Sequence, residues 1–368
     1  MKMDKVNINR YSRQLLLPEI GWNGQLAISQ AKILVVGAGG LGCAALLNLV
    51  CSGIGTIGIV DHDIIEEHNL PRQMLFDEVH IGENKALIAA EVIKNKNSDC
   101  EVVAYPKKLD VSNVNEIFIN YDLVLDCTDN FPSRYLISDA CALLKIPSIH
   151  GSLFRFEGQV AVLNHALTGI SYRSIFPEEQ PKDNINSCTD DGILGAVANI
   201  IGTIQANEAI MLISGAKTSF SPKLLWINLR DFKSYSIELI EDSKAEANCP
   251  ITWSQLIAHN YEVSCAQRSI EINISELTED QSKDYFIDVR EDYERFESNP
   301  FSHTCFSLSD IKEKVTTLPL DKRIIVYCQS GYKSRIAVNI LRNQFGIQNA
   351  YSLKNGITDM INFTKEKL

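Results

Sequence analysis

Apolar runs of strand length alternate with helical patterns over roughly the first 240 residues of the chain. Such alternation favours a mostly parallel sheet with helices on both faces, a Rossmann-like doubly wound α/β fold. The expected strands lie at residues 33–37, 57–61, 101–104, 122–127 and 146–150. Another apolar run, 193–213, contains polar residues and an acid, so a buried helix explains it better than a membrane span.

The pattern breaks at 241–248, a polar segment with the composition of a domain linker. A smaller α/β unit follows, with expected strands at 285–289 and 324–327. We therefore expect one domain at 1–245, a linker with a short helix at 246–269, and a smaller second domain at 270–368. A polar stretch, 171–191, indicates a long loop near a site.

Composition, net charge and cysteine spacing argue against several classes of protein. The net charge of −11 argues against a nucleic-acid surface, which needs a concentrated basic patch. The polar start of the chain predicts no secretory signal, and no membrane association is expected. None of the ten cysteines forms a Cys-x-x-Cys pair, so a disulfide framework is not expected. These features together predict a cytoplasmic protein.

The glycine-rich turn from Gly37 to Gly42 follows an apolar run and opens a helix-like run. Glycines at such a turn let backbone amides approach a phosphate at a helix N-terminus. Asp61 ends the next apolar run, about 20 residues on, where a ribose-binding acid is expected. Taken alone, this pattern indicates a dinucleotide site and a nicotinamide-dependent oxidoreductase.

Three other features favour adenylation over redox chemistry. Asp126 and Asp129 follow an apolar strand, so an acid at the ligand edge of the sheet could hold Mg²⁺ against a triphosphate. Arg72 and Lys85 supply cations that would stabilise charge on the α-phosphate as pyrophosphate leaves. Arg13 lies in an N-terminal charged segment outside the sheet, from where it could reach a neighbouring subunit.

These motifs resemble the MoeB/ThiF/HesA adenylyltransferases, bacterial relatives of the ubiquitin-activating enzymes, over about residues 5–240. The resemblance implies that ATP and Mg²⁺ activate the C-terminal Gly-Gly of a small ubiquitin-like sulfur carrier protein, and that the enzyme is a homodimer. It implies a catalytic Arg13 that reaches the partner subunit's phosphates, and Asp129 as the Mg²⁺ ligand. The implied nucleotide-binding residues are Gly40, Asp61, Asn69, Leu70, Arg72, Lys85, Asp129 and Asn130.

The chain departs from that family at its structural zinc site. The two Cys-x-x-Cys pairs of many members correspond to segments 171–174 and 249–252, where only Cys249 is a thiol. Hydroxyls are poor zinc ligands, so we predict no zinc and expect hydrophobic packing to hold this corner. Cys188 matches a loop cysteine that in some relatives joins the carrier covalently; a catalytic and a conformational role both stay open.

A second thiol site is predicted at Cys328, where an apolar strand meets a helical run. Backbone amides at the helix start, with Lys333 and Arg335, favour the thiolate form. A phosphatase loop would need an arginine six residues after the cysteine, where Ser334 stands. Residues 270–368 instead resemble a single-domain rhodanese, although only Gly356 remains of a common Gly-Gly pair.

The two resemblances combine into one chemical hypothesis. The first domain would convert the carrier's carboxylate into an acyl-adenylate, and a Cys328 persulfide would then supply sulfur. A cysteine desulfurase is the expected sulfur donor. Which carrier is served stays open, among the molybdopterin, thiamin and tRNA or cysteine sulfur pathways. A carrier-binding scaffold without catalysis is the main alternative, and a nicotinamide-dependent oxidoreductase the other.

Overall fold

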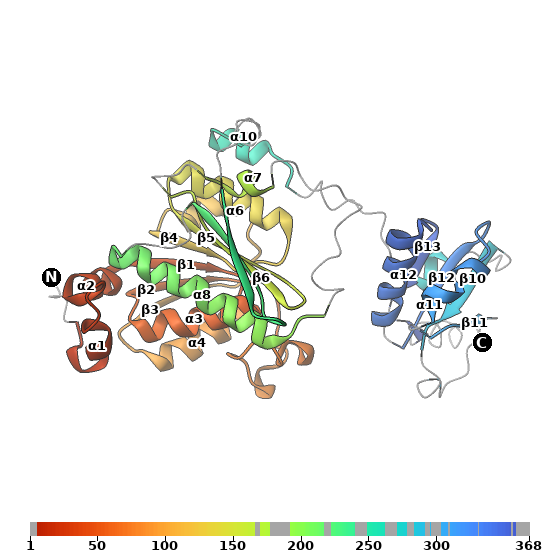
Figure 1. Ribbon diagram of the computed structural model, residues 1–368, viewed down its shortest axis with the longest axis horizontal. Coiled ribbons are helices and arrows are strands. Elements are labelled where there is room, and N and C mark those ends of the chain that lie inside the picture. Colours follow the sequence, from red (N-terminus) through yellow and green to blue (C-terminus); the bar gives the residue numbers. More distant parts are fainter. Residues whose placement is uncertain are drawn as a thin grey trace. The chain divides into compact units, whose positions relative to one another are not determined.

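The computed structural model describes residues 6–165, 170–176, 192–216, 222–239, 249–261, 271–277, 283–290, 295, 303–307, 310–329, 331–354 and 356–357. The chain divides into two compact units, with the break between residues 262 and 263 (Figure 1). This break falls inside the predicted linker, while the exact domain boundaries stay a prediction. Each unit is described by itself.

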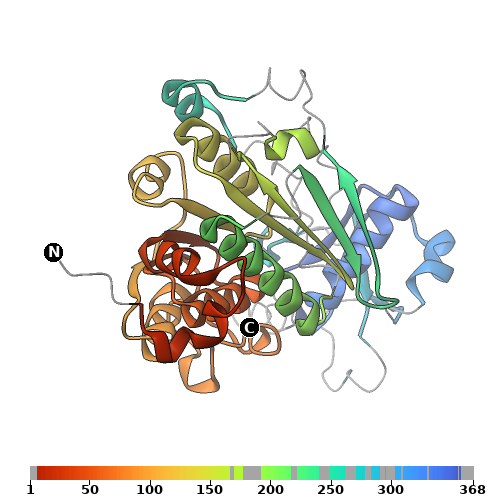
Figure 2. The same cartoon turned by 60° about the vertical axis from the view of Figure 1, so that its left-hand side comes forward.

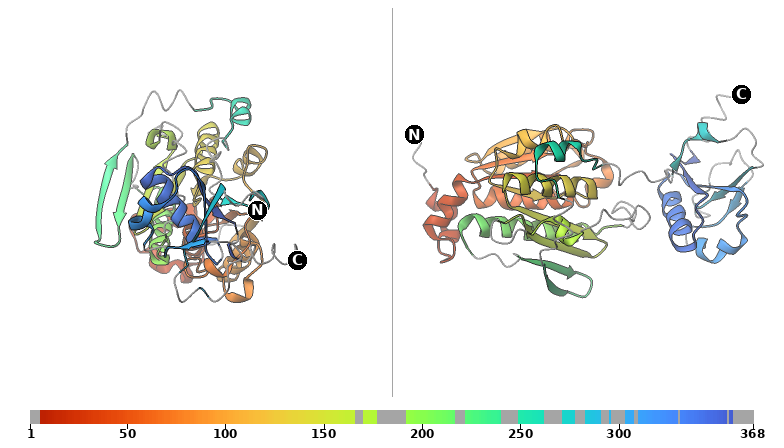
Figure 3. Two further views of the ribbon diagram at one scale, coloured as in Figure 1. Left: turned by 90° about the vertical axis from the view of Figure 1, so that its right-hand side faces the viewer. Right: turned by 90° about the horizontal axis from the view of Figure 1, so that it is seen from above.

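The larger unit contains an eight-stranded sheet in the order β3-β2-β1-β4-β5-β6-β7-β8. The first five strands in this order are parallel, and the remaining pairings are antiparallel. The predicted doubly wound parallel sheet is therefore confirmed, and the β7–β8 hairpin extends it at one edge (Figure 3). The strands are β1 Lys32–Val36, β2 Thr56–Val60, β3 Glu101–Tyr105, β4 Leu123–Asp126, β5 Ser148–Phe154, β6 Glu157–Leu163, β7 Lys223–Asn228 and β8 Lys233–Glu238.

Helices cover both faces of this sheet because successive strand residues point to opposite sides. Ile33 and Val35 of β1 belong to a core with α3, α4 and α8, while Leu34 and Val36 face a second core with α5 and α6. The helices are α1 Ile8–Leu15, α2 Gly21–Gln30, α3 Gly40–Ser52, α4 Lys85–Lys96, α5 Val114–Phe118, α6 Phe131–Leu144, α7 Tyr172–Ile175, α8 Gly195–Ser214 and α10 Trp253–Ala258, with short 3₁₀ turns η1 Glu67–Asn69 and η2 Glu78–His80.

Helix α8, green in Figure 2, is long and apolar enough to cross a membrane by length and composition alone. In this unit it packs instead against α3, β5 and β6. Gly202 brings the helix against the backbone of Leu41, and no side chain would fit between them. Gln205 and Glu208 are buried on it. This packing agrees with the predicted buried helix.

The corner where a zinc site was considered is held by a buried ion pair as well as by hydrophobic contacts. Arg173 donates two hydrogen bonds to the Asp139 carboxylate, at 3.0 and 2.8 Å, and Tyr261 donates a third at 2.8 Å. Cys249 also contacts Asp139, with its Sγ 3.6 Å from Oδ1. The expected hydrophobic packing is present, and the ion pair, which the sequence analysis did not predict, adds to it.

The hydroxyl residues of this corner have a local role. Ser171 begins α7 as its N-cap, and the Ser171 and Ser174 side chains bond reciprocally to each other's backbone amides. Thr252 begins α10, and its Oγ1 accepts a hydrogen bond from the backbone amide of Gln255 at 3.2 Å. Serine and threonine are preferred at such positions because their oxygens satisfy free helix amides.

The smaller unit contains a five-stranded sheet in the order β11-β10-β12-β13-β9, in which every pairing is parallel. The two strands expected from the sequence are confirmed as β10 and β12. Apolar residues on the two faces of the sheet form separate clusters. The elements are β9 Glu271–Ile272, η4 Ile274–Glu276, β10 Asp284–Asp288, β11 His303–Cys305, α11 Ile311–Lys314, η7 Val315–Thr317, β12 Arg323–Tyr327, α12 Tyr332–Phe345 and β13 Ala350–Leu353.

We predict that Asp139→Asn destabilises the larger unit by about 3–5 kcal/mol, because it leaves the buried Arg173 guanidinium without its counter-charge. All three tryptophans (Trp22, Trp226 and Trp253) lie in the larger unit, so their fluorescence during urea unfolding reports on this unit alone. Asp231→Asn is the matched control, since Asp231 pairs with Lys233 at the exposed surface. We expect no measurable change there. Equal losses of unfolding free energy in both variants would contradict a stabilising role of the buried Asp139–Arg173 pair.

Candidate active site

The glycine turn lies where β1 passes into α3. Gly37 has φ of +95°, and a side chain there would lie against the carbonyl oxygen of Cys127. Gly42 approaches the Gly37 carbonyl so closely that a methyl group would overlap it. The N-cap of α3 is Gly39, which has no side chain to occupy the free amides of the first turn. These amides therefore form an anion-binding end of the helix.

Asp61 follows β2 and is bound to the glycine turn. One carboxylate oxygen accepts a hydrogen bond from the amide of Ala38 at 2.7 Å, and the other accepts from the amide of Asp63 at 2.9 Å. Burial raises the pKa of Asp61, and these two hydrogen bonds act in the opposite direction. The carboxylate thus fixes the turn and stands at the same edge of the sheet.

The predicted cations lie close to this edge. The Lys85 ammonium is buried and forms an ion pair with Asp63 at 2.9 Å. Arg72 is half-buried, and its Nη1 donates to the His68 carbonyl at 2.7 Å. A side chain at Gly40 would meet Arg72, so the structure brings these two predicted residues together.

The segment directly before Arg72 holds the predicted Asn69 and Leu70. Asn69 is buried, and its Oδ1 accepts from the amide of Glu66 at 3.2 Å. Leu70 packs against the core that contains α3. Sequence reasoning did not select Gln73 as a site residue, yet its amide is buried next to Gly39. The sequence feature that could have identified Gln73 is its position directly after the predicted Arg72.

Asp129 and Asn130 lie in the turn that follows β4, and both are exposed. Among the described residues, the Asp129 carboxylate has one hydrogen-bond partner, the Asn130 amide at 3.5 Å. Asn130 also caps α6, because its Oδ1 accepts from the amide of Ser133 at 3.0 Å. An exposed carboxylate with a single weak partner fits a Mg²⁺ ligand, since Mg²⁺ keeps several waters and few protein oxygens.

Two predicted catalytic residues are not brought to this edge by the described chain. Arg13 lies on α1 with an exposed side chain. Cys188 lies outside the described residues. Their predicted roles stay predictions.

The second thiol site lies where β12 passes into α12. Cys328 is buried, and its Sγ lies 3.7 Å from the Ser334 hydroxyl. Ser334 in turn contacts the Ser352 hydroxyl at 2.8 Å and donates to the Gly331 carbonyl at 3.0 Å. Gly356 lies against the Cys328 carbonyl with φ of +59°, so the one glycine kept from the common pair stands where a side chain would not fit.

Two arginines lie near this loop, and each has an acidic neighbour at a different distance. Arg290 is buried, pairs with Asp288 at 2.9 Å and donates to the Gln329 side chain at 3.2 Å. It therefore links the end of β10 to the residue after Cys328. The predicted Arg335 is half-buried, and its guanidinium lies 3.9 Å from Glu271, which offsets part of its charge.

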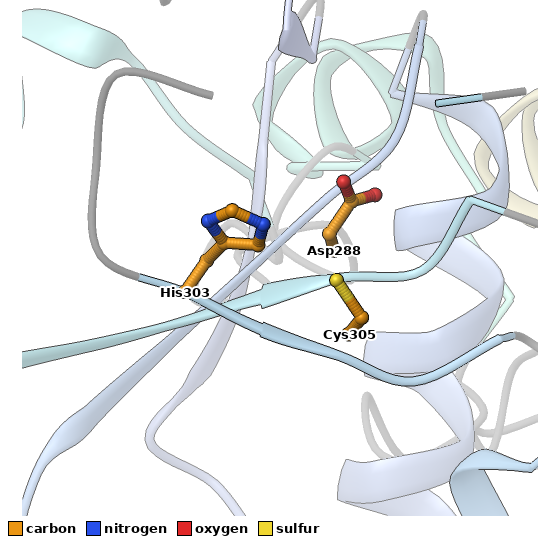
Figure 4. A group of neighbouring side chains, drawn as sticks. All are labelled: Asp288, His303 and Cys305. Atoms are coloured by element: carbon orange, nitrogen blue, oxygen red, sulfur yellow. The ribbon is translucent and has the colours of Figure 1, made fainter. Parts of the chain in front are cut away.

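Figure 4 shows a neighbouring group of possible metal ligands, Asp288, His303 and Cys305. Arg290 already donates to both carboxylate oxygens of Asp288, through its backbone amide, Nε and Nη2. A metal ion would have to compete with this guanidinium for a saturated carboxylate. We assign no metal to this group.

The fold and the two sites define a nucleotide-binding α/β unit combined with a parallel α/β unit that carries a buried loop cysteine. The comparisons with known proteins agree with this class. The ThiF family model matches residues 11–251, and the rhodanese-like domain model matches residues 273–362. The chain belongs to the ThiF family, with a C-terminal rhodanese-like domain.

Relatives share this arrangement over nearly the whole chain. "Adenylyltransferase and sulfurtransferase MOCS3" of Xenopus laevis is 33% identical over 95% of this chain and 84% of its own length. "Adenylyltransferase and sulfurtransferase UBA4" of Vanderwaltozyma polyspora is 34% identical over 97% and 89%. The chain is therefore an enzyme with an adenylyltransferase domain and a sulfurtransferase domain. Neither the domains nor the relatives support the oxidoreductase alternative.

Solved structures support the fold of the first unit. Escherichia coli MccB with ATP has a TM-score of 0.57 and 23% identity, and covers 67% of this chain and 75% of that one. PaaA has a TM-score of 0.56 and 22% identity, with coverage of 66% and 77%. At this identity the likeness concerns the fold alone.

We predict that Gly37→Ala destabilises the larger unit by about 2–5 kcal/mol, which combines the left-handed backbone and the overlap with Cys127. Gly82→Ala is the matched control, because Gly82 has nearly the same φ of +94° with open space around it. The control should lose only about 1–2 kcal/mol. Urea unfolding followed by tryptophan fluorescence measures both. Equal losses would show that the contact with Cys127 contributes nothing.

Proposed function

We propose that this enzyme adenylates the C-terminal Gly-Gly of a ubiquitin-like sulfur carrier with ATP and Mg²⁺, and then transfers sulfur from a Cys328 persulfide to give a thiocarboxylate. The observation that carries the proposal is the presence in one chain of two complementary sites. One is an edge with anion-binding amides, two cations and an exposed acid; the other is a buried thiol in a turn before a helix.

In the first step, the carrier's carboxylate would attack the α-phosphate of ATP and pyrophosphate would leave. The amides at the start of α3 would hold phosphate oxygens, and Arg72 would stabilise the charge that develops there. Lys85 would have to share its ammonium with Asp63. Asp129 would hold Mg²⁺, which neutralises the departing pyrophosphate. Asp61 would bind the ribose hydroxyls.

In the second step, the terminal sulfur of the Cys328 persulfide would attack the acyl carbon of the adenylate and release AMP. The product is an acyl disulfide between Cys328 and the carrier. A second thiol would then attack the Cys328 sulfur, form a disulfide with it and release the carrier thiocarboxylate. Cys188 is our candidate for this thiol. An external dithiol would reduce the resulting disulfide, and a cysteine desulfurase would restore the persulfide.

The remaining parts of the proposal concern assembly and environment. The exposed Arg13 would act on the phosphates of a partner subunit in a homodimer. We propose a cytoplasmic enzyme that holds no structural zinc, since Asp139 and Arg173 occupy the corner considered for that metal. The pathway that the carrier serves stays open among the molybdopterin, thiamin and tRNA or cysteine sulfur pathways. A carrier-binding scaffold without catalysis is the alternative that the first experiment must exclude.

The first experiment is ATP–pyrophosphate exchange with each Gly-Gly-ending sulfur carrier from the same genome. We expect exchange with one carrier, and a loss of at least ~100-fold in Asp129→Ala, which removes the acid at the departing phosphates. Asp122→Ala is the control, because this exposed acid lies at the opposite end of β4. Bound ATP without exchange for any carrier would favour the scaffold, and full exchange in Asp129→Ala would refute the assigned role.

We predict that Cys328→Ala separates the two steps. Exchange should stay within about twofold of the wild-type value, because this cysteine belongs to the other unit, while thiocarboxylate formation should be lost. Mass spectrometry of the carrier detects the added sulfur. Cys305→Ala is the control, since Cys305 is an exposed thiol of the same sheet. Undiminished sulfur transfer in Cys328→Ala would remove the persulfide from the mechanism.

A further inference from the structure

A buried acid–histidine pair lies directly before the turn that carries Asp129. Asp126 ends β4, His150 lies in the neighbouring strand β5, and the two residues are directly paired in the register. The Asp126 Oδ2 and the His150 Nδ1 are 3.0 Å apart, and both side chains are almost completely buried. The nucleotide site described above makes no use of this pair.

The charges of the pair follow from its surroundings. Burial lowers the pKa of His150 despite the neighbouring carboxylate. Burial alone would raise the pKa of Asp126, but hydrogen bonds from His150 and Thr128 and the charge of Arg134 outweigh it and lower that pKa. A neutral imidazole therefore donates from Nδ1 to an ionised carboxylate. Nε2 is buried and has no hydrogen-bond partner among the described residues.

The other oxygen of Asp126 holds the turn itself. Its Oδ1 accepts from the backbone amide of Thr128 at 3.1 Å and from the Thr128 hydroxyl at 2.6 Å. On the opposite side, Arg134 donates to the Thr128 carbonyl at 3.0 Å. Thr128 directly precedes Asp129, so the orientation of the Asp126 carboxylate sets the path of the chain into the exposed acid.

The backbone of Asp126 is fixed independently. Gln205 of α8 donates to the Asp126 carbonyl at 2.8 Å and to the Ile149 carbonyl at 3.1 Å. The only freedom left to the carboxylate is rotation of its side chain. His150 removes that freedom, because it binds the oxygen that the turn does not use.

We propose that His150 is a positioning residue for adenylation, which through the Asp126 carboxylate holds the Thr128 turn so that Asp129 meets Mg²⁺ and the nucleotide. The inference rests on the proposed function, since it concerns the same site. Removing the Nδ1 donor leaves the carboxylate free to rotate away from Thr128. Asp129 then samples positions in which it is a poorer ligand.

Two variants separate positioning from packing. His150→Phe keeps a ring against Tyr172, whose centroid lies 4.8 Å from the imidazole, and removes the donor. His150→Asn restores a donor near the position of Nδ1 and loses the ring. Loss of the donor should raise the Mg²⁺ concentration for half-maximal exchange, and the dissociation constant for ATP in Mg²⁺, about tenfold in the Phe variant. The Asn variant should stay within about threefold of wild type.

Both variants should lower the midpoint of urea unfolding, because His150→Asn loses the ring and His150→Phe removes a hydrogen bond from the buried Asp126 carboxylate. Tyr121→Phe is the control, because it removes a buried hydroxyl of the same unit that bonds to Tyr105, outside the turn. Both the Mg²⁺ requirement and the ATP affinity should be unchanged in this control.

A Phe variant with wild-type ATP affinity and Mg²⁺ requirement would overturn the inference, as would an Asn variant weaker than the Phe variant in both. ATP affinity is measured by calorimetry on the full chain without a carrier, so this result does not depend on exchange. A wild-type enzyme that binds ATP with Mg²⁺ but shows no exchange would instead refute the proposed function. The two failures are therefore distinguishable.

Discussion

The close approach of two backbone turns is the constraint on which the nucleotide edge depends. Gly37 lies against the Cys127 carbonyl, and the Cys127 amide donates to the Val36 carbonyl at 2.9 Å. The glycine turn and the acidic turn are thus joined without any side chain between them. Because β1 lies between β2 and β4, Asp61 reaches the same turn from the other side and binds the Ala38 amide. Three loops far apart in sequence form one rigid edge.

Local patterns predicted this edge well, because each of its parts is formed by a short continuous segment of the chain. Strand periodicity located β1, β2 and β4, and the run of glycines located the turn, in which the structure shows a left-handed backbone at Gly37. Parallel strands end at a common edge, so Asp61 and Asp129 could be placed together from the sequence. The same reasoning located Cys328, since a strand followed by Ser-Gly and a helical run defines its loop.

Long-range polar contacts were beyond this reasoning. Asp139 looks like an isolated acid in an apolar helix, and its partners Arg173 and Tyr261 are 34 and 122 residues away. His150 ends a run that reads as an ordinary buried strand, and its pairing with Asp126 depends on the register between β4 and β5. No local pattern predicts such a contact, because only the tertiary fold brings the two partners together. Hydroxyls in place of thiols suggested a weakened corner, whereas they cap two helices.

The buried carboxylates are compensated in two different ways, and the difference bears on function. Asp139 and Asp288 are each paired with a buried arginine, which cancels their charge and leaves a rigid, neutral connection. Asp126 is instead held by a neutral imidazole, with Arg134 bound to the Thr128 carbonyl. The pair itself keeps a negative charge beneath the exposed Asp129. A cation that approaches Asp129 therefore also meets the field of the buried Asp126 carboxylate, which Arg134 offsets in part. An arginine in place of His150 would cancel this negative charge and so oppose the Mg²⁺ binding that we propose for Asp129.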